Sequence, residues 1–152
     1  MVRGKRKAME IMQQQMAVMT LGSEDLDRAK GFYGNGFGWT PVFENPEIVF
    51  YQMNGFVLGL FLKASLEVDM GTGGLSLSRG AYALAHNVRG QAEVDPLMEK
   101  LVSAGGSIIR AADAPPHGGY RGYVADPDGH AWEIAWNPAW PISPEGYVRF
   151  VS

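Results

Sequence analysis

The fold of this chain is constrained most by an order of secondary-structure elements that occurs twice. In each half, the spacing of apolar residues predicts one strand, one helix and three further strands. The first half carries these at residues 16–21, 26–33, 39–43, 48–53 and 56–63, and the second at 81–88, 92–104, 107–110 and in the hairpin 120–136. Placing Val88 opposite Ser23 superposes the strand-to-helix junctions at an offset of about 65 residues. The sequence therefore predicts an α+β protein built from two β-α-β-β-β modules.

The final hairpin is the most clearly marked element of the second module. Its turn, residues 126–129 (Asp-Pro-Asp-Gly), combines a proline with preset φ, two aspartates that can bond nearby amides and a glycine that accepts positive φ. After the turn, the two-residue period of a strand puts Trp132, Ile134 and Trp136 on one face, the natural core face. Glu133 therefore points to the opposite face, between two alanines, into either solvent or a cavity.

Three stretches of the chain share the motifs of a known family. Residues 123–136 carry an aromatic strand, the Asp-Pro-Asp-Gly turn and an apolar residue before a glutamate. Residues 20–33 read as a strand followed by D-L-x-x-A-x-x-F-Y, and residues 84–88 open the second half. In this order and spacing they resemble the vicinal oxygen chelate superfamily, which includes glyoxalase I, extradiol dioxygenases, fosfomycin-resistance enzymes and bleomycin-resistance proteins. The resemblance covers roughly residues 16–137 and implies that the curved mixed sheets of the two modules pair around a cavity.

The domain organisation follows from the same stretches. We expect residues 1–15 to be a disordered basic extension and residues 16–152 to be one domain, with modules at about 16–63 and 81–137 and a C-terminal tail at 138–152. The glycine-rich residues 64–80 read either as a linker between the modules or as a lid over a cavity mouth. In the tail, three prolines prevent a helix, and residues 147–151 alternate as an edge strand or as a segment that crosses to a partner subunit.

Composition excludes several classes of function. An apolar content of 46% with 19% charged residues is ordinary for a soluble globular protein, and no stretch approaches the roughly 20 apolar residues of a membrane span. A formal net charge of −3 gives no basic footprint for nucleic acid. The chain has no cysteine, so it has neither disulfides nor a thiolate metal site. We expect a cytoplasmic protein that binds neither membrane nor nucleic acid.

The resemblance also identifies where a metal would bind. Metal-dependent members use one His, Gln or Glu on the first and last strand of each module, and by register those positions are Val18, Gly59, Ala83 and Glu133. Only Glu133 can ligate, while a divalent ion needs several oxygen or nitrogen ligands at about 2.0 to 2.6 Å. The expected cofactor is therefore none, although a divalent metal with an incomplete ligand set stays open. His86 faces the helix by strand alternation, and a register slip of one residue would turn it into the cavity.

Alternation within each strand also predicts which residues line the cavity. The expected ligand-binding set is Gly59, Phe61, Ala83, Asn87, His117 and Tyr120. Glu133 is the candidate catalytic residue, because a carboxylate in an apolar cavity has a raised pKa and can serve as a general base. The third histidine, His130, is expected to be exposed beside the turn.

Two functions remain open. The first is a metal-free protein of the bleomycin-resistance type that binds a small apolar or cationic aromatic compound, which the missing ligands favour. The second is a glyoxalase-like lyase, isomerase or dioxygenase that uses a divalent metal or Glu133. The resemblance further implies a homodimer, and apolar side chains in the tail, among them Trp140 and Phe150, favour pairing there.

Overall fold

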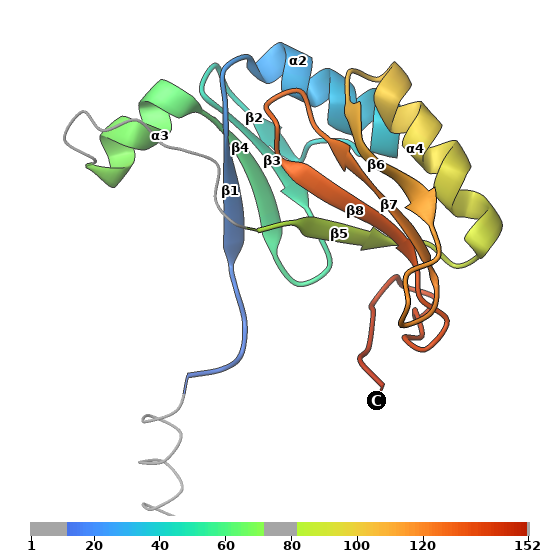
Figure 1. Ribbon diagram of the computed structural model, residues 1–152. Coiled ribbons are helices and arrows are strands. Elements are labelled where there is room, and N and C mark those ends of the chain that lie inside the picture. The colour runs from blue at the N-terminus through green and yellow to red at the C-terminus, as the bar shows by residue number, and fades with distance from the viewer. Residues whose placement is uncertain (1–11, 72–81, 152) are drawn as a thin grey trace, which may run out of the picture.

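The computed structural model describes residues 12–71 and 82–151, and both modules have the predicted order of elements (Figure 1). One sheet contains β1 (Val18–Ser23), β2 (Phe43–Glu44), β3 (Ile48–Gln52) and β4 (Val57–Leu62), in the order β1-β4-β3-β2. The other contains β5 (Leu84–Asn87), β6 (Ser107–Asp113), β7 (Tyr120–Ala125) and β8 (Ala131–Trp136), in the order β5-β8-β7-β6. In each sheet the first strand of the module pairs in parallel with the last. The predicted α+β fold with two β-α-β-β-β modules is confirmed.

The first helix is longer than predicted. Asp25 caps α2 (Leu26–Gly31) by accepting a hydrogen bond from the amide of Arg28 at 3.0 Å. The chain then continues as a π-helix, η1 (Phe32–Phe37), and ends at Gly38, whose φ is 80°. The predicted end at Gly34 is therefore early, and the predicted strand at 39–43 shrinks to the two residues of β2.

The second helix lies against the first. The short η2 (Gln91–Glu93) leads into α4 (Val94–Ser103), which agrees with the predicted helix at 92–104. A Cβ atom on Gly36 would come within 2.7 Å of the Leu101 side chain, so glycine permits the close approach of η1 and α4.

Part of the predicted linker between the modules is a helix, which the sequence analysis did not predict, and Lys63, expected to end the preceding strand, begins it. α3 (Lys63–Met70) begins directly after β4, has no side-chain cap at its start and buries none of its residues. It carries no apolar stripe that sequence periodicity could detect. Residues 72–81 and the first part of the predicted N-terminal extension lie outside the described residues.

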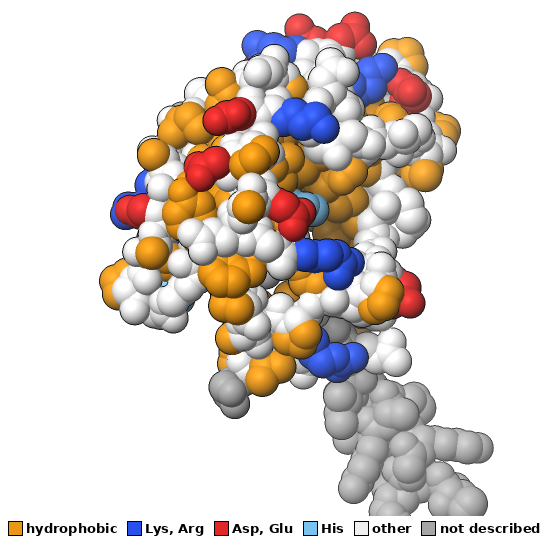
Figure 2. Space-filling model, turned by 90° about the vertical axis from the view of Figure 1, so that its right-hand side faces the viewer, with side chains coloured by type: hydrophobic (Ala, Val, Ile, Leu, Met, Phe, Trp, Pro, Cys, Tyr) orange, Lys and Arg blue, Asp and Glu red, His pale blue; other side chains and the backbone are white. Residues whose placement is uncertain are grey.

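The two modules share one hydrophobic core. It combines Phe32 and Tyr33 of the first module with Trp132 and Ile134 of the second, and all four side chains are at most 4% exposed. Trp132 and Ile134 therefore lie on the core face as predicted, and Glu133 lies on the opposite face, half-buried. At the surface, hydrophobic side chains cover much of the face shown in Figure 2, with charged side chains of both signs scattered among them. Among the described helices, none is long and apolar enough to cross a membrane.

The C-terminal tail folds back on the molecule instead of adding a strand to a sheet. Ile142 and Val148 form an isolated antiparallel bridge, and Trp140 contacts Phe150 edge to face at 5.3 Å. The guanidinium of Arg89 donates hydrogen bonds to the carbonyl oxygens of Ile142 and Ser143 at 3.1 and 2.8 Å. These contacts fasten the tail to the second module.

Candidate functional site

The predicted cavity face exists as a sheet surface, but its residues do not gather around one pocket. Ala85 is paired with Glu133, and Asn87 is paired with Ala135, so both lie on the Glu133 face of β5. Ala83 lies directly before β5 and is exposed. Glu133 remains a candidate catalytic residue only by its position on this face.

The predicted residues of the first module share the equivalent face of the other sheet. Gly59 is paired with Thr20 and Phe50, and Phe61 with Gly22. A Cβ atom on Gly59 would meet the Phe50 ring at 3.2 Å. The Phe50 ring therefore bounds the space beside Gly59.

Tyr120 lies on the opposite side of its sheet from the predicted one. The hairpin joins Ala125 to Ala131 through five residues, so Tyr123, not Tyr120, lies opposite Glu133. Tyr120 faces α4, where its hydroxyl donates to Asp95 at 2.7 Å. Alternation counted within each strand missed this because the length of the connection sets which faces match. His117 is exposed in the loop before β7.

The residues that the family pattern assigns to a metal do not fit one here. The strand pairing places Thr20, not Val18, beside Gly59, and Ala85, not Ala83, beside Glu133. With these two replacements Glu133 is still the only carboxylate among the four metal positions. Across residues 12–71 and 82–151, no group of three or more His, Cys, Asp or Glu side chains could hold a metal ion. A divalent ion needs more donors than these positions supply within one chain.

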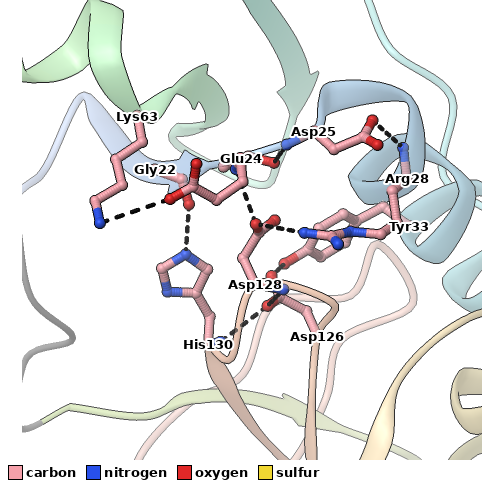
Figure 3. A network of polar contacts seen from close by, with 10 residues as sticks. Gly22, Glu24, Asp25, Arg28, Tyr33, Lys63, Asp126, Asp128 and His130 are labelled. Atoms are coloured by element: carbon pink, nitrogen blue, oxygen red, sulfur yellow. Dashed lines mark hydrogen bonds and ion pairs between the residues drawn. The ribbon is translucent and has the colours of Figure 1, made fainter.

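The turn of the last hairpin forms a network of polar contacts between the modules (Figure 3). We call its four residues, Tyr33, Asp126, Asp128 and His130, the clamp. The Tyr33 hydroxyl donates to Asp126 at 2.6 Å and accepts from the indole N–H of Trp132 at 3.1 Å. The other oxygen of Asp126 accepts from the backbone amides of Asp128 and His130 at 2.9 and 2.8 Å. Burial raises the pKa of Asp126, and the Tyr33 hydrogen bond opposes that rise.

The other two clamp residues reach the first module. Asp128 accepts from the amide of Glu24 at 2.9 Å and from the Arg28 guanidinium at 3.1 Å. His130 Nε2 donates to the carbonyl of Gly22 at 2.9 Å, which leaves Nδ1 to accept from Tyr82. His130 is therefore half-buried, and the prediction that it is exposed is wrong. These partners make the clamp a fastening between modules.

A polar cleft of about 790 Å³ lies beside the clamp, between β1, α3 and the hairpin turn. Its lining includes the charged side chains of Glu24 and Lys63. Lys63 and Glu24 face each other at 3.7 Å, and both are partly exposed. Charged side chains line this cleft, which distinguishes it from the second one.

The second cleft has about 710 Å³ and lies between the modules at the opposite end of β1 from the clamp. We call it the aromatic cleft. Five aromatic residues line it, namely Trp39, Tyr51, Phe56, Trp132 and Tyr147. Among the described residues that line it, none is Asp, Glu, Lys or Arg. Such a mainly apolar cleft between structural units, with a few polar groups, is typical of sites for small organic molecules.

Tyr51 and His86 are two lining residues of the aromatic cleft whose side chains make no hydrogen bond to a described residue. Tyr51 is 2% exposed, and its hydroxyl has no hydrogen-bond partner among the described residues. Burial raises the pKa of Tyr51 to about 12, with the charge of Glu44 adding to the effect. His86 likewise makes no hydrogen bond to a described residue, although its ring lies edge-on to Phe37 at 5.4 Å and to Trp39 at 6.1 Å. Burial lowers the pKa of His86.

The tail borders the aromatic cleft. Gly146, Tyr147 and Val148 line it, and the side-chain amide of Asn54 holds the carbonyl of Glu145 at 3.0 Å. Because Asn54 belongs to the first module and Arg89 to the second, the tail bridges both modules beside this cleft.

Sequence reasoning identified one residue of this site. Asn87 lines the aromatic cleft as well as the predicted face. Strand alternation predicted that His86 lies on the helix-covered face, and the structure agrees, but His86 was not included among the expected ligand-binding residues. Tyr51 and Trp39 were missed, and no sequence signal marks them, because the cleft forms only where two modules meet.

Comparison with known proteins is consistent with this fold. Residues 15–134 match the Glyoxalase/Bleomycin resistance protein/Dioxygenase superfamily. The chain is 61% identical to a glyoxalase-related enzyme from Fulvimarina pelagi, with a TM-score of 0.87 over 92% of this chain and 100% of that one. A glyoxalase/bleomycin resistance protein/dioxygenase family enzyme from Burkholderia phytofirmans PsJN has 18% identity and a TM-score of 0.73, covering 80% and 98%. A lactoylglutathione lyase from Agrobacterium tumefaciens has 22% identity and a TM-score of 0.66, covering 87% and 100%. The last two show likeness of fold.

Proposed function

The chain belongs to the glyoxalase/bleomycin resistance protein/dioxygenase superfamily, and we propose that it is a metal-free small-molecule-binding protein whose ligand occupies the aromatic cleft. The observation that carries the proposal is a cleft of about 710 Å³ walled by five aromatic rings from both modules and the tail. Its volume lies within the range of roughly 300 to 1,000 Å³ usual for small-molecule pockets.

The lining favours an uncharged ligand. No charged side chain is available to pair with a carboxylate or an ammonium group, and an unpaired buried charge is costly. The earlier expectation of a cationic ligand depended on Glu133, which lines neither cleft.

Catalysis through Glu133 is the competing function. The Fulvimarina relative is named an enzyme, and a bound small molecule is common to both functions. We place the ligand at the aromatic cleft because aromatic side chains from both modules and the tail line it, whereas Glu133 lines neither cleft.

A pair of tryptophan substitutions tests this location. Leu84 is half-buried, shares the face of its strand partner Trp132 and lines the aromatic cleft, so Leu84→Trp should fill the cleft. Ser107 is exposed and lines the polar cleft, so Ser107→Trp is the control. In a thermal-shift screen of neutral aromatic fragments, hits should disappear in Leu84→Trp and persist in Ser107→Trp. The reverse pattern, or hits that survive both changes, would contradict the proposal.

We also propose that the protein forms a homodimer through its tail. Tyr147, Val148 and Phe150 are 53%, 46% and 68% exposed, which is more apolar surface than a solvated tail requires. Sedimentation equilibrium should show a dimer at micromolar concentration, and Phe150→Ser should weaken it. A monomer at high micromolar concentration would refute the proposal.

A further inference from the structure

β5 is an edge strand that borders the aromatic cleft. In the sheet order β5-β8-β7-β6 it has a neighbouring strand on one side only (Figure 1). All its residues, Leu84–Asn87, line the aromatic cleft. The N–H and C=O groups on the free side of an edge strand are open to pairing with another extended segment. The cleft therefore meets main-chain groups as well as side chains.

Strand pairing determines which main-chain groups lie on the free side of β5. The N–H and C=O groups of successive residues in a strand point to opposite sides, so alternate residues bond the neighbouring strand. The amide of Val88 donates to the carbonyl of Ala135 at 2.8 Å, so the groups of His86, two residues earlier, also point towards β8. Those of Ala85 and Asn87 point away from β8, and outside the sheet they have no main-chain hydrogen bond to a described residue. Ala85 is exposed and Asn87 is half-buried, so both are accessible to a ligand.

The side chains of β5 determine where an added segment would project. Residues opposite each other in adjacent strands put their side chains on the same face. His86 is paired with Ile134 on the core face and lines the cleft from there. A ligand residue opposite His86 therefore directs its side chain into the cleft. In parallel orientation, that residue also donates its N–H to the carbonyl of Ala85 and accepts from the N–H of Asn87 with its own carbonyl.

We propose that the aromatic cleft binds an uncharged extended peptide, whose main chain adds to the free edge of β5 and whose aromatic side chain enters the cleft. This inference rests on the proposed function and adds the chemical class of the ligand. In such strand additions, main-chain hydrogen bonds hold the peptide and a pocket selects its side chain. Phe56 is half-buried and Tyr147 is 53% exposed, so their rings are accessible to that side chain. Charged peptide ends would find no partner among the described lining residues.

The probe is N-acetyl-phenylalanine N-methylamide, which is uncharged and carries one aromatic side chain. One control replaces the phenylalanine N–H by an ester oxygen and so removes the donor to Ala85. The other is the N,N-dimethylamide, which lacks only the N–H on the side away from β5. In titrations followed by ¹H–¹⁵N NMR, the ester should bind roughly five- to tenfold more weakly than the probe and the dimethylamide within about threefold. The amide proton of Asn87 should move downfield with the probe, while that of Val88, already bonded to Ala135, stays in place.

Two substitutions at one position separate main chain from side chain. Asn87→Pro removes the N–H on the free side, where an edge strand tolerates proline, and Asn87→Ala removes the side chain alone. Asn87→Pro should bind the probe roughly five- to tenfold more weakly than Asn87→Ala. If Asn87→Pro does not fold, the comparison of probe and ester decides.

The outcomes separate this inference from the proposed site. Equal binding of probe and ester, or an Asn87 amide that does not move at saturation, overturns the inference. So does absence of probe binding while fragment hits that Leu84→Trp removes persist, and in each of these cases the proposed site stands. Absence of both probe binding and fragment hits overturns the inference and the proposed site together.

Discussion

The clamp and the aromatic cleft lie at opposite ends of β1, and they treat buried polar atoms in opposite ways. In the clamp, Asp126 is 3% exposed and accepts hydrogen bonds from Tyr33 and two backbone amides. In the cleft, Tyr51 is equally buried and has no partner among the described residues. Trp132 belongs to both, because its indole N–H bonds Tyr33 while its ring lines the cleft. The difference separates polar groups that hold the modules together from a buried hydroxyl that makes no hydrogen bond to a described residue.

Removing the central clamp carboxylate should have the largest effect. Asp126→Ala leaves the Tyr33 hydroxyl and two amides without their acceptor, and we expect a loss of about 3 to 5 kcal/mol in the free energy of unfolding. Urea denaturation measures it. Asp27→Ala, which removes an exposed carboxylate that lies 3.8 Å from Lys30, is the control and should cost under about 1 kcal/mol. Equal losses would show that the clamp is not a special fastening.

The same one-atom change at two tyrosines compares the regions directly. Tyr33→Phe removes a hydroxyl that both donates to Asp126 and accepts from Trp132, so it should cost about 1 to 3 kcal/mol. Tyr51→Phe removes a hydroxyl without a partner, so stability should stay within about 1 kcal/mol of the wild type or rise. Chemical denaturation of the two variants without ligand is sufficient. Similar losses of stability in the two variants would show that the Tyr33 and Tyr51 hydroxyls do not differ in their contribution to folding.

The free energy of unfolding should also decrease at acidic pH because of His86, which lines the cleft. Its folded-state pKa is lowered, so the unfolded chain takes up the proton first as the pH falls. The stability from neutral His86 is complete above about pH 6.5 and is lost as the pH falls towards the folded-state pKa, with a slope of at most about 1.4 kcal/mol per pH unit. His86→Gln should flatten this part of the curve, measured by urea unfolding between pH 7.5 and pH 5. His117→Gln, at an exposed histidine, should leave the curve unchanged.

The smallest effect is expected from loosening the tail. Arg89→Ala removes two hydrogen bonds between an exposed side chain and the carbonyls of residues 142 and 143, which should cost about 0.5 to 1.5 kcal/mol. Because the tail borders the cleft, a neutral aromatic fragment found in the thermal-shift screen should dissociate faster from this variant in stopped-flow experiments. An unchanged dissociation rate would show that the tail does not cover the ligand.

The sequence was sufficient for the fold because each signal was local and repeated. The Asp-Pro-Asp-Gly turn, the cap at Asp25 and the alternation around Trp132 each depend on neighbours in the chain, and all are present in the structure. The same locality explains the wrong face for Tyr120, since strand pairing across a five-residue connection is not contained in either strand alone. α3 was missed because it buries no residue.

The candidate site could be predicted only in part. Asn87 was found from strand alternation, but Trp39, Tyr51 and Trp132 converge from three elements in two modules. Whether the Tyr51 hydroxyl has a partner depends on every neighbouring atom, which no sequence pattern specifies. The face around Glu133 was the more obvious prediction because an isolated carboxylate is visible in the sequence.

The most direct test of the account follows the tyrosine hydroxyls while ligand is added. The chain has six tyrosines, and ¹³C at the ring carbon bearing the hydroxyl reports hydrogen bonding at each, with Tyr51→Phe and Tyr33→Phe assigning the two resonances. On titration with a neutral aromatic fragment found in the thermal-shift screen, the Tyr51 resonance should move and saturate at one ligand per chain because Tyr51 lines the aromatic cleft, while that of Tyr33 stays in place. Movement of Tyr33 or Tyr82 with Tyr51 unchanged would put the ligand at the clamp end and contradict the account.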